Sequence, residues 1–348
     1  MTALVAVVAL AGCTKNENVA VEDTTVFVKI SNELETKAIG DPIGSSTPIV
    51  FTDGFLFFTD GGGVITKRYT IAPSGGDMSV TQLQSGYQIT GVPSSSTQVF
   101  VVGTIPSGIS VPAAGNISAV QALAISVQSQ ADASSTKVNR ATLYGAGTVS
   151  GATASLSVKP IAARVEVGSI TGGGTVSAYK VTGIFINNYY PDSKLSGLVN
   201  GALVNNANDA AKYVGNGAQY TTALAPIYDY NASGLPSMSG LVCSPGAGKV
   251  WNYNVMAPTD AAAAPRVIIR LSDVVLGTGA SAYTFPSDQF LTVKLGTLTS
   301  LAAGKAYNLG NIAFTESNLG STPETATVSV TVTITTVAWT TESVSPVL

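Results

Sequence analysis

The stretch Val328-Ser329-Val330-Thr331-Val332-Thr333-Ile334-Thr335 alternates strictly between apolar and hydroxyl side chains. Because successive side chains of a β-strand point to opposite faces, this alternation predicts a long strand with one apolar face. We place the strand at residues 326–339, ending in Val337-Ala338-Trp339. A strand of this kind needs a partner, which lies either within its own domain or in another molecule.

The rest of the chain has the same character. Segments rich in Val, Ile, Thr, Tyr and Phe recur along it and end at Gly, Pro, Ser, Asn or Asp, which predicts an all-β fold. The exception is a stretch in which apolar residues recur at three- and four-residue spacing and Asn116 is placed to cap the first turn, so we expect one short amphipathic helix in the first domain. Its apolar positions are Ile117, Val120, Leu123, Ala124 and Val127.

Composition excludes several classes of chemistry. The 348 residues include no histidine and 2 cysteines, so a Ser-His-Asp relay or a histidine-bound zinc is ruled out. The formal net charge is -3, with 17 basic and 20 acidic residues, which lacks the basic excess needed for nucleic acid. We expect no cofactor and no enzymatic activity.

The first residues are typical of an export signal. Ala3 to Ala11 is an unbroken apolar run, too short to span a membrane as a helix, and it ends in Leu10-Ala11-Gly12-Cys13. This ending resembles a bacterial lipoprotein box, so we expect residues 1–13 to be a signal peptide and Cys13 to carry lipid. Met1-Thr2 supplies no Lys or Arg, which suggests a start codon further upstream. With Cys13 acylated, Cys243 has no partner for a disulfide and is expected to be a buried thiol.

An expected strand and a candidate protease site follow the signal. Val26, Val28 and Ile30 share one face of an expected strand, and the polar sequence after it contains a trypsin-like site, Lys37-Ala38. Ala163 to Val167 is expected to be a strand, and the stretch Ser169 to Thr175 after it contains Gly172-Gly173-Gly174, so we place a boundary there between domains 38–170 and 171–348.

Taken in order, these features resemble the fimbrillins of Bacteroides-type bacteria, the subunits of type V pili that include the major-fimbrillin and Mfa-like proteins. The resemblance covers nearly the whole chain, through short and degenerate motifs. Those motifs are Leu10 to Cys13, the helix 117–127, Lys159 to Val167, Val181 to Asn188, Ala303 to Leu309, and Val328 to Trp339.

The resemblance implies two tandem transthyretin-like β-sandwich domains and export to the outer membrane as a palmitate-bearing lipoprotein. It also implies that residues 14–37 are a propeptide, which a trypsin-like or arginine-specific protease removes by cleavage after Lys37. The displaced strand, with Val26, Val28 and Ile30, would be replaced by a neighbour's C-terminal strand, with Val328, Val330, Val332, Ile334 and Trp339. The product would be a cell-surface fimbrium for adhesion or biofilm formation, with other pilin subunits and a host protein or glycan as partners. The first arginine is Arg68, so the protease must accept lysine if the cut is at Lys37.

Other interpretations stay open at this stage. The same pilus has anchor and tip subunits, and a monomeric surface lipoprotein could bind glycans through exposed tyrosines. The candidate tyrosines are Tyr179, Tyr189, Tyr190, Tyr228, Tyr230 and Tyr253. A glycosidase would need a carboxylate pair among Asp53, Asp60, Asp192, Asp229, Asp260, Asp273 and Asp288. Gly61-Gly62-Gly63 before Lys67 lacks the spacing of a phosphate loop and predicts a hairpin turn.

Overall fold

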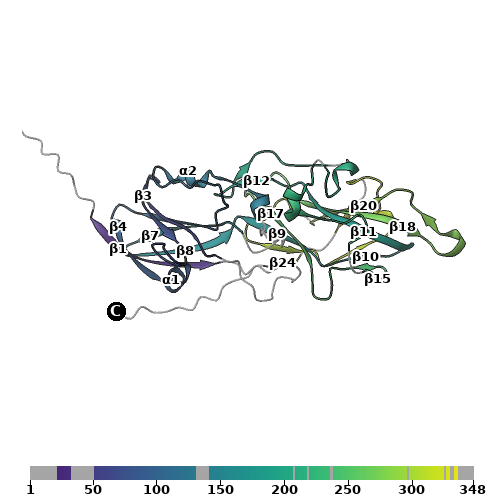
Figure 1. Cartoon of the computed structure of the whole chain (residues 1–348), viewed down its shortest axis with the longest axis horizontal. Coiled ribbons are helices and arrows are strands. Elements are labelled where there is room, and N and C mark those ends of the chain that lie inside the picture. The colour runs from purple at the N-terminus through teal and green to yellow at the C-terminus, as the bar shows by residue number, and fades with distance from the viewer. Residues whose placement is uncertain are drawn as a thin grey trace, which may run out of the picture.

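The computed structural model describes residues 22–32, 51–130, 141–206, 208–217, 219–235, 238–295, 298–324, 327–329 and 333–335. They form an elongated molecule with one large sheet at one end and several smaller sheets around a second core at the other (Figure 1). None of the helices within these ranges has the length and hydrophobicity of a membrane-crossing segment.

The large sheet has seven strands in the spatial order β3-β2-β5-β7-β8-β1-β4. Alternating apolar residues give these strands one face that points into a common core. The strands are β1 (Asp23–Asn32), β2 (Gly54–Thr59), β3 (Ile65–Ile71), β4 (Tyr87–Pro93), β5 (Gln98–Gly103), β7 (Leu143–Ser150) and β8 (Thr153–Pro160). As expected, Gly61-Gly62-Gly63 lies in the turn of the antiparallel β2–β3 hairpin.

A short helix, α1 (Val80–Ser85), packs against β1 and closes part of this core. It starts with a capping box, because the Ser79 hydroxyl accepts from the Gln82 N–H at 3.3 Å and the Gln82 side chain accepts from the Ser79 N–H at 2.8 Å. Val80 and Leu83 are its buried residues. The fold therefore has a second helix that the sequence analysis did not expect.

The second half of the chain is built mainly from three further sheets. One has the order β14-β11-β18-β20-β23, with β19 paired to β18, another β17-β9-β21-β24, and a third β15-β16-β10-β22. Their bounds are β9 (Ala162–Val167), β10 (Ser169–Gly172), β11 (Val176–Asn187), β14 (Tyr228–Tyr230), β15 (Met238–Ser239), β16 (Val242–Cys243), β17 (Trp251–Met256), β18 (Arg266–Leu276), β19 (Tyr283–Thr284), β20 (Gln289–Lys294), β21 (Ala306–Asn308), β22 (Asn311–Phe314), β23 (Thr327–Ser329) and β24 (Thr333–Thr335). Short 3-10 turns lie at η1 (Val127–Gln130), η2 (Ala210–Lys212), η3 (Thr222–Ile227), η4 (Gly279–Ser281) and η5 (Glu316–Asn318).

A small sheet joins the two halves. It has the order β13-β12-β6, in which β6 (Ala124–Ser126) pairs antiparallel with β12 (Asp192–Lys194), and β12 pairs with β13 (Val199–Asn200). The larger apolar core also takes in Phe57, Phe100 and Val102 from the seven-stranded sheet. The two halves therefore share buried surface.

The helix expected over residues 117–127 is shorter than predicted. Asn116 caps it as expected, accepting from the Ser118 N–H at 3.0 Å, but α2 ends at Gln121 (Ile117–Gln121). Ala124–Ser126 leaves the helical path to form β6, because its backbone pairs with β12. A pairing partner almost 70 residues away overrides the local periodicity, as tertiary contacts often do.

The middle of the molecule contains a buried polar row. On β9, Arg164 and Glu166 alternate with the apolar Ala163, Val165 and Val167, and their side chains form an ion pair at 2.7 Å with exposed fractions of 3% and 0%. Glu166 Oε2 also accepts from Asn308 Nδ2 on β21 at 3.0 Å. A charge pair at this depth stabilises the fold only while both partners are present.

The all-β fold expected from the sequence is confirmed. The division into two sandwich domains at residue 170 stays a prediction. By sheet membership the change comes earlier, between β8 and β9, since β9 pairs with β17 and β21.

Candidate strand-exchange site

The N-terminal strand β1 lies inside the seven-stranded sheet, with a hydrogen-bonded partner on each side (Figure 1). It runs antiparallel to β4, with Val26 opposite Ile89 and Val28 opposite Tyr87. It runs parallel to β8, where Ile30 lies opposite Leu156. Removing β1 would therefore separate β4 from β8 and leave two rows of backbone groups without partners.

The inner face of β1 supplies part of the core. Val26, Val28 and Ile30 are 1%, 0% and 2% exposed and pack in one cluster with residues of β4, β8 and α1. The outer residues Thr24 and Thr25 are exposed. Such burial stabilises by about 1.5–3 kcal/mol per side chain, so the three together contribute roughly 4.5–9 kcal/mol. If β1 were removed, a strand that replaced it between β4 and β8 would need three apolar side chains at two-residue spacing to fill the same part of the core.

The outer face of β1 has one specific contact. The Phe27 ring, 38% exposed, lies against Gly86, where an added Cβ would be 2.1 Å from the ring. Gly86 ends α1 with a φ of 92°, a conformation that suits glycine. Glycine at this position therefore leaves room for the Phe27 ring.

The described pieces of the C-terminal segment lie at the edges of two sheets. Among the described strands, β23 is at the end of the order β14-β11-β18-β20-β23, and β24 is at the end of the order β17-β9-β21-β24. β23 pairs parallel with β20 through Thr327–Ser329, and β24 pairs antiparallel with β21 through Thr333–Thr335. The two described pieces thus pair with different sheets, whereas the sequence pattern predicted one long strand.

The predicted site residues fall into two groups. Val26, Val28 and Ile30 lie together in β1, Val328 is 6% exposed in β23, and Ile334 lies opposite Tyr307 in the β21–β24 ladder. Cys13, Lys37, Ala38, Val330, Val332 and Trp339 lie outside the described residues. Their predicted roles in lipidation, cleavage and strand donation stay predictions.

The tyrosines considered for a glycan surface are mostly in the core. Tyr179, Tyr189, Tyr190, Tyr228 and Tyr253 are 9% exposed or less. Burial raises the pKa of Tyr179 to about 12, and its hydroxyl donates to the carbonyls of Ile170 and Leu241 at 2.7 and 2.9 Å. These side chains therefore cover a core, which removes the main support for the glycan-binding interpretation.

Cys243 is buried, and two of the loop acids, Asp60 and Asp288, form contacts that stabilise the fold. Cys243 is fully buried, and burial raises its pKa to about 11, so it is a poor nucleophile at neutral pH. Asp60 accepts the Gly62 and Val64 N–H groups at 2.9 Å, and Asp288 forms an ion pair with Arg270 at 2.5 Å. No group of three or more acidic or cysteine side chains that could hold a metal occurs among the described residues.

The chain matches no known sequence family and no curated protein. It is similar to the solved structure of "a putative cell adhesion protein" from Bacteroides eggerthii, with 17% identity over 92% of this chain and 98% of that chain and a TM-score of 0.56. Two similar structures with lower TM-scores come from Porphyromonas gingivalis. One is a fimbrilin, with 13% identity over 91% of this chain and 98% of that chain and a TM-score of 0.48. The other is the tip fimbrial protein Mfa3, with 9% identity over 91% of this chain and 100% of that chain and a TM-score of 0.41. At these identities the likeness shows the fold alone, and the chain has the all-β fold of the Bacteroides eggerthii protein.

Proposed function

We propose that this chain is a non-enzymatic structural subunit of a type V fimbria, which polymerises when a neighbour's C-terminal strand takes the place of β1. In this proposal the precursor is exported as a lipoprotein with lipid on Cys13. Cleavage after Lys37 then separates residues 14–37, which include β1, from the folded body. The assembled subunits serve adhesion or biofilm formation at the cell surface.

The observation that carries the proposal is the difference between the two terminal strands. β1 is an interior strand, whereas β23 and β24 are edge strands with three paired residues each. An interior strand leaves a gap that another strand can fill by main-chain pairing, and an edge strand can leave its sheet without separating other strands. The chain therefore combines a slot with a segment suited to fill it.

The side-chain pattern of the segment matches the slot. β1 offers three inward apolar residues at two-residue spacing, and Val328, Val330, Val332 and Ile334 offer four at the same spacing. One additional buried side chain adds about 1.5–3 kcal/mol, which favours the neighbour's strand over β1 by roughly 10- to 150-fold. Four side chains together contribute roughly 6–12 kcal/mol, against an association cost of about 4–15 kcal/mol. Backbone pairing and contacts between the bodies must supply the surplus.

Proteolysis acts as the switch in this scheme. While β1 is covalently attached, it competes for its place between β4 and β8 at an effective concentration near millimolar or higher. The strand of a separate molecule cannot reach that concentration in solution, so it cannot displace β1. Once the bond after Lys37 is cut, a departing β1 is diluted and the neighbour's strand competes at its own concentration. The fold shared with "a putative cell adhesion protein" is compatible with a role in adhesion.

The test is to treat purified precursor with trypsin and follow polymer ladders on semi-native gels. Wild-type protein should form ladders only after cleavage, and a variant ending at Glu324 should be cleaved and stay monomeric. Ladders from the truncated variant would refute the role of the C-terminal strand. The Lys37→Gln variant controls for the position of the cut and should retain residues 14–37.

Amino-terminal sequencing of surface material separates the alternatives. Ala38 as first residue favours the polymerising subunit, and a blocked Cys13 favours an anchor subunit or a monomeric lipoprotein. A tip subunit would be cleaved, yet would appear once in each fibre instead of along its length.

A further inference from the structure

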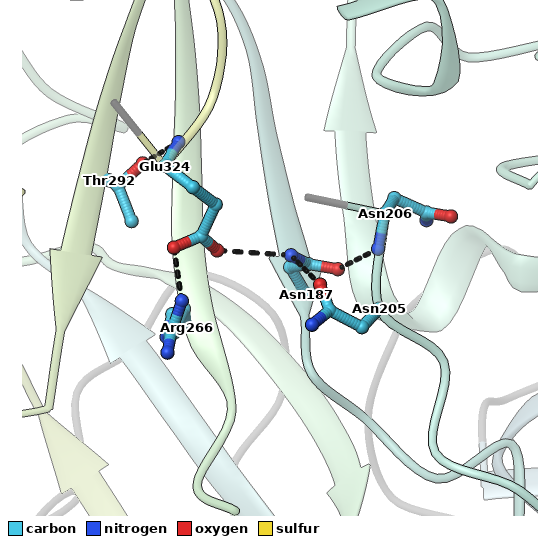
Figure 2. A network of polar contacts seen from close by, with 6 residues as sticks. All are labelled: Asn187, Asn205, Asn206, Arg266, Thr292 and Glu324. Carbon is cyan, nitrogen blue, oxygen red and sulfur yellow. Dashed lines mark hydrogen bonds and ion pairs between the residues drawn. The ribbon is translucent and has the colours of Figure 1, made fainter. Parts of the chain in front are cut away.

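A polar network holds the chain just before the C-terminal segment (Figure 2). The Glu324 carboxylate, whose side chain is 7% exposed, forms an ion pair with Arg266 through Nη1. It also accepts from Asn187 Nδ2 at 3.1 Å, and the Glu324 N–H donates to Thr292 Oγ1 at 2.7 Å. Glu324 is thus held through both its side chain and its backbone.

The partners of Glu324 belong to three neighbouring strands of one sheet. Asn187 ends β11, Arg266 begins β18, and Thr292 lies within β20. Asn187 and Thr292 are fully buried, and Asn187 Oδ1 accepts the Asn206 N–H at 2.9 Å while its Nδ2 also donates to Asn205 Oδ1 at 3.2 Å. The network therefore connects Glu324 to buried side chains of β11 and β20.

The backbone turns at this residue. Glu324 has a φ of 66°, in the left-handed region that residues other than glycine rarely adopt. Thr292, which accepts its N–H, pairs with Thr327 at the start of the β20–β23 ladder. Glu324 is therefore a firmly held residue three positions before the start of β23.

We propose that Glu324 is a positioning residue that fixes the base of the C-terminal strand during exchange, so that only residues after Glu324 leave their own subunit. This inference rests on the proposed function, because it concerns the strand that the neighbour receives. Val328, the first inward residue of that strand, is four residues beyond Glu324. At about 3.3–3.6 Å per extended residue, the chain from Glu324 to Val328 spans at most about 14 Å. The folded bodies of successive subunits must therefore lie against each other.

The pair Thr292→Val and Thr292→Ser tests this directly. Valine keeps the branched shape and removes the acceptor for the Glu324 N–H, whereas serine keeps the hydroxyl. We expect the valine variant to form ladders about tenfold more slowly, the change that corresponds to the loss of one buried hydrogen bond, and the serine variant to match wild type. Circular dichroism melts establish that each variant is folded, and rates are compared at equal concentrations of folded protein. Glu324→Gln, which keeps the shape and removes the charge, provides a second variant and should also slow ladder formation.

Hydrogen exchange gives a readout that a purely structural role would not change. In wild-type polymer, the amides of residues 319–322 and of Glu324 should remain as protected as in the precursor, while those of residues 327–335 change. Loss of protection at 319–322 and Glu324 on polymerisation, or a wild-type rate for Thr292→Val, would overturn the inference. The proposed function fails separately, if cleaved wild type stays monomeric or if a chain ending at Glu324 polymerises.

Discussion

Replacing Ile30 by alanine should destabilise the precursor and leave the polymer unchanged. Ile30 is 2% exposed in β1, lies opposite Leu156, and packs in the core beneath α1. Truncating a buried isoleucine to alanine costs about 2–5 kcal/mol, because it removes transfer free energy and leaves a cavity. For a domain of this size, a loss of about 3 kcal/mol lowers the melting temperature by roughly 6–12 °C.

The assay is thermal unfolding followed by circular dichroism, on precursor and on trypsin-treated polymer. Thr25→Ala is the matched control, because Thr25 is exposed on the same strand and should change the stability by no more than about 0.5 kcal/mol. The Ile30→Ala precursor should melt well below wild type. Its polymer should melt with the wild-type polymer, since residue 30 is no longer part of it.

Two results would contradict the replacement of β1 in the polymer. An unchanged precursor would mean that β1 is not packed in the sheet as described. An equal loss of stability in precursor and polymer would mean that β1 remains in place after assembly, so that no neighbour's strand has replaced it.

Three further predictions concern the second half of the chain. Because burial raises the pKa of Cys243 to about 11, its thiol should resist iodoacetamide at pH 8 in native protein and react after denaturation; rapid labelling of native protein would contradict its burial. Burial raises the pKa of Tyr179 to about 12, above its ordinary value of about 10, so the neutral phenol is favoured in the fold. The stability it contributes is complete below pH 10 and should fall as the pH rises towards 12, and urea unfolding across this range should show a smaller decline for Tyr179→Phe. Glu166→Gln removes one charge of the buried pair with Arg164 and should cost about 3–5 kcal/mol in urea unfolding, compared with no more than about 0.5 kcal/mol for Glu22→Gln at an exposed position.

Much of the sheet structure could be predicted from local pattern. Val26 to Ile30, Ala154 to Val158 and Gln98 to Val102 read as strands because their inward residues alternate or run together as buried strands do, and they lie in β1, β8 and β5. β4 escaped prediction because Gly91, at a φ of 72°, and Pro93 interrupt its pattern, although it is a direct partner of β1. The first helix also escaped, although Ser79 followed three residues later by Gln82 is a capping signal visible in the sequence.

The partners of strands could not be predicted from the same patterns. A period of two residues specifies which face of a strand is apolar and says nothing of the neighbouring strand. This is why residues 326–339 were expected to form one strand, whereas Thr327–Ser329 and Thr333–Thr335 pair with different sheets. Likewise, Ala124–Ser126 continues the helical spacing of the sequence but forms β6, because its backbone pairs with the distant strand β12.

Buried polar groups were the least predictable feature. Arg164 and Glu166 sit in a segment that was correctly predicted as a strand, yet nothing local indicated that both charges are buried. Glu324 gave no signal at all, because its partners Asn187, Arg266 and Thr292 are brought to it only by the assembled sheet. The burial of the tyrosines considered for a glycan-binding surface likewise depends on the assembled sheets, so the sequence alone did not indicate it.

In the assembled fibre, we expect a neighbour's C-terminal strand to lie between β4 and β8. Electron cryomicroscopy of trypsin-processed fibres would show that strand and trace it to its molecule of origin. We predict a strand bearing Val328, Val330, Val332 and Ile334 on its inner face and continuous with Glu324 of the adjacent subunit. A strand there that still carries Val26, Val28 and Ile30, or that belongs to the same subunit, would contradict the claim.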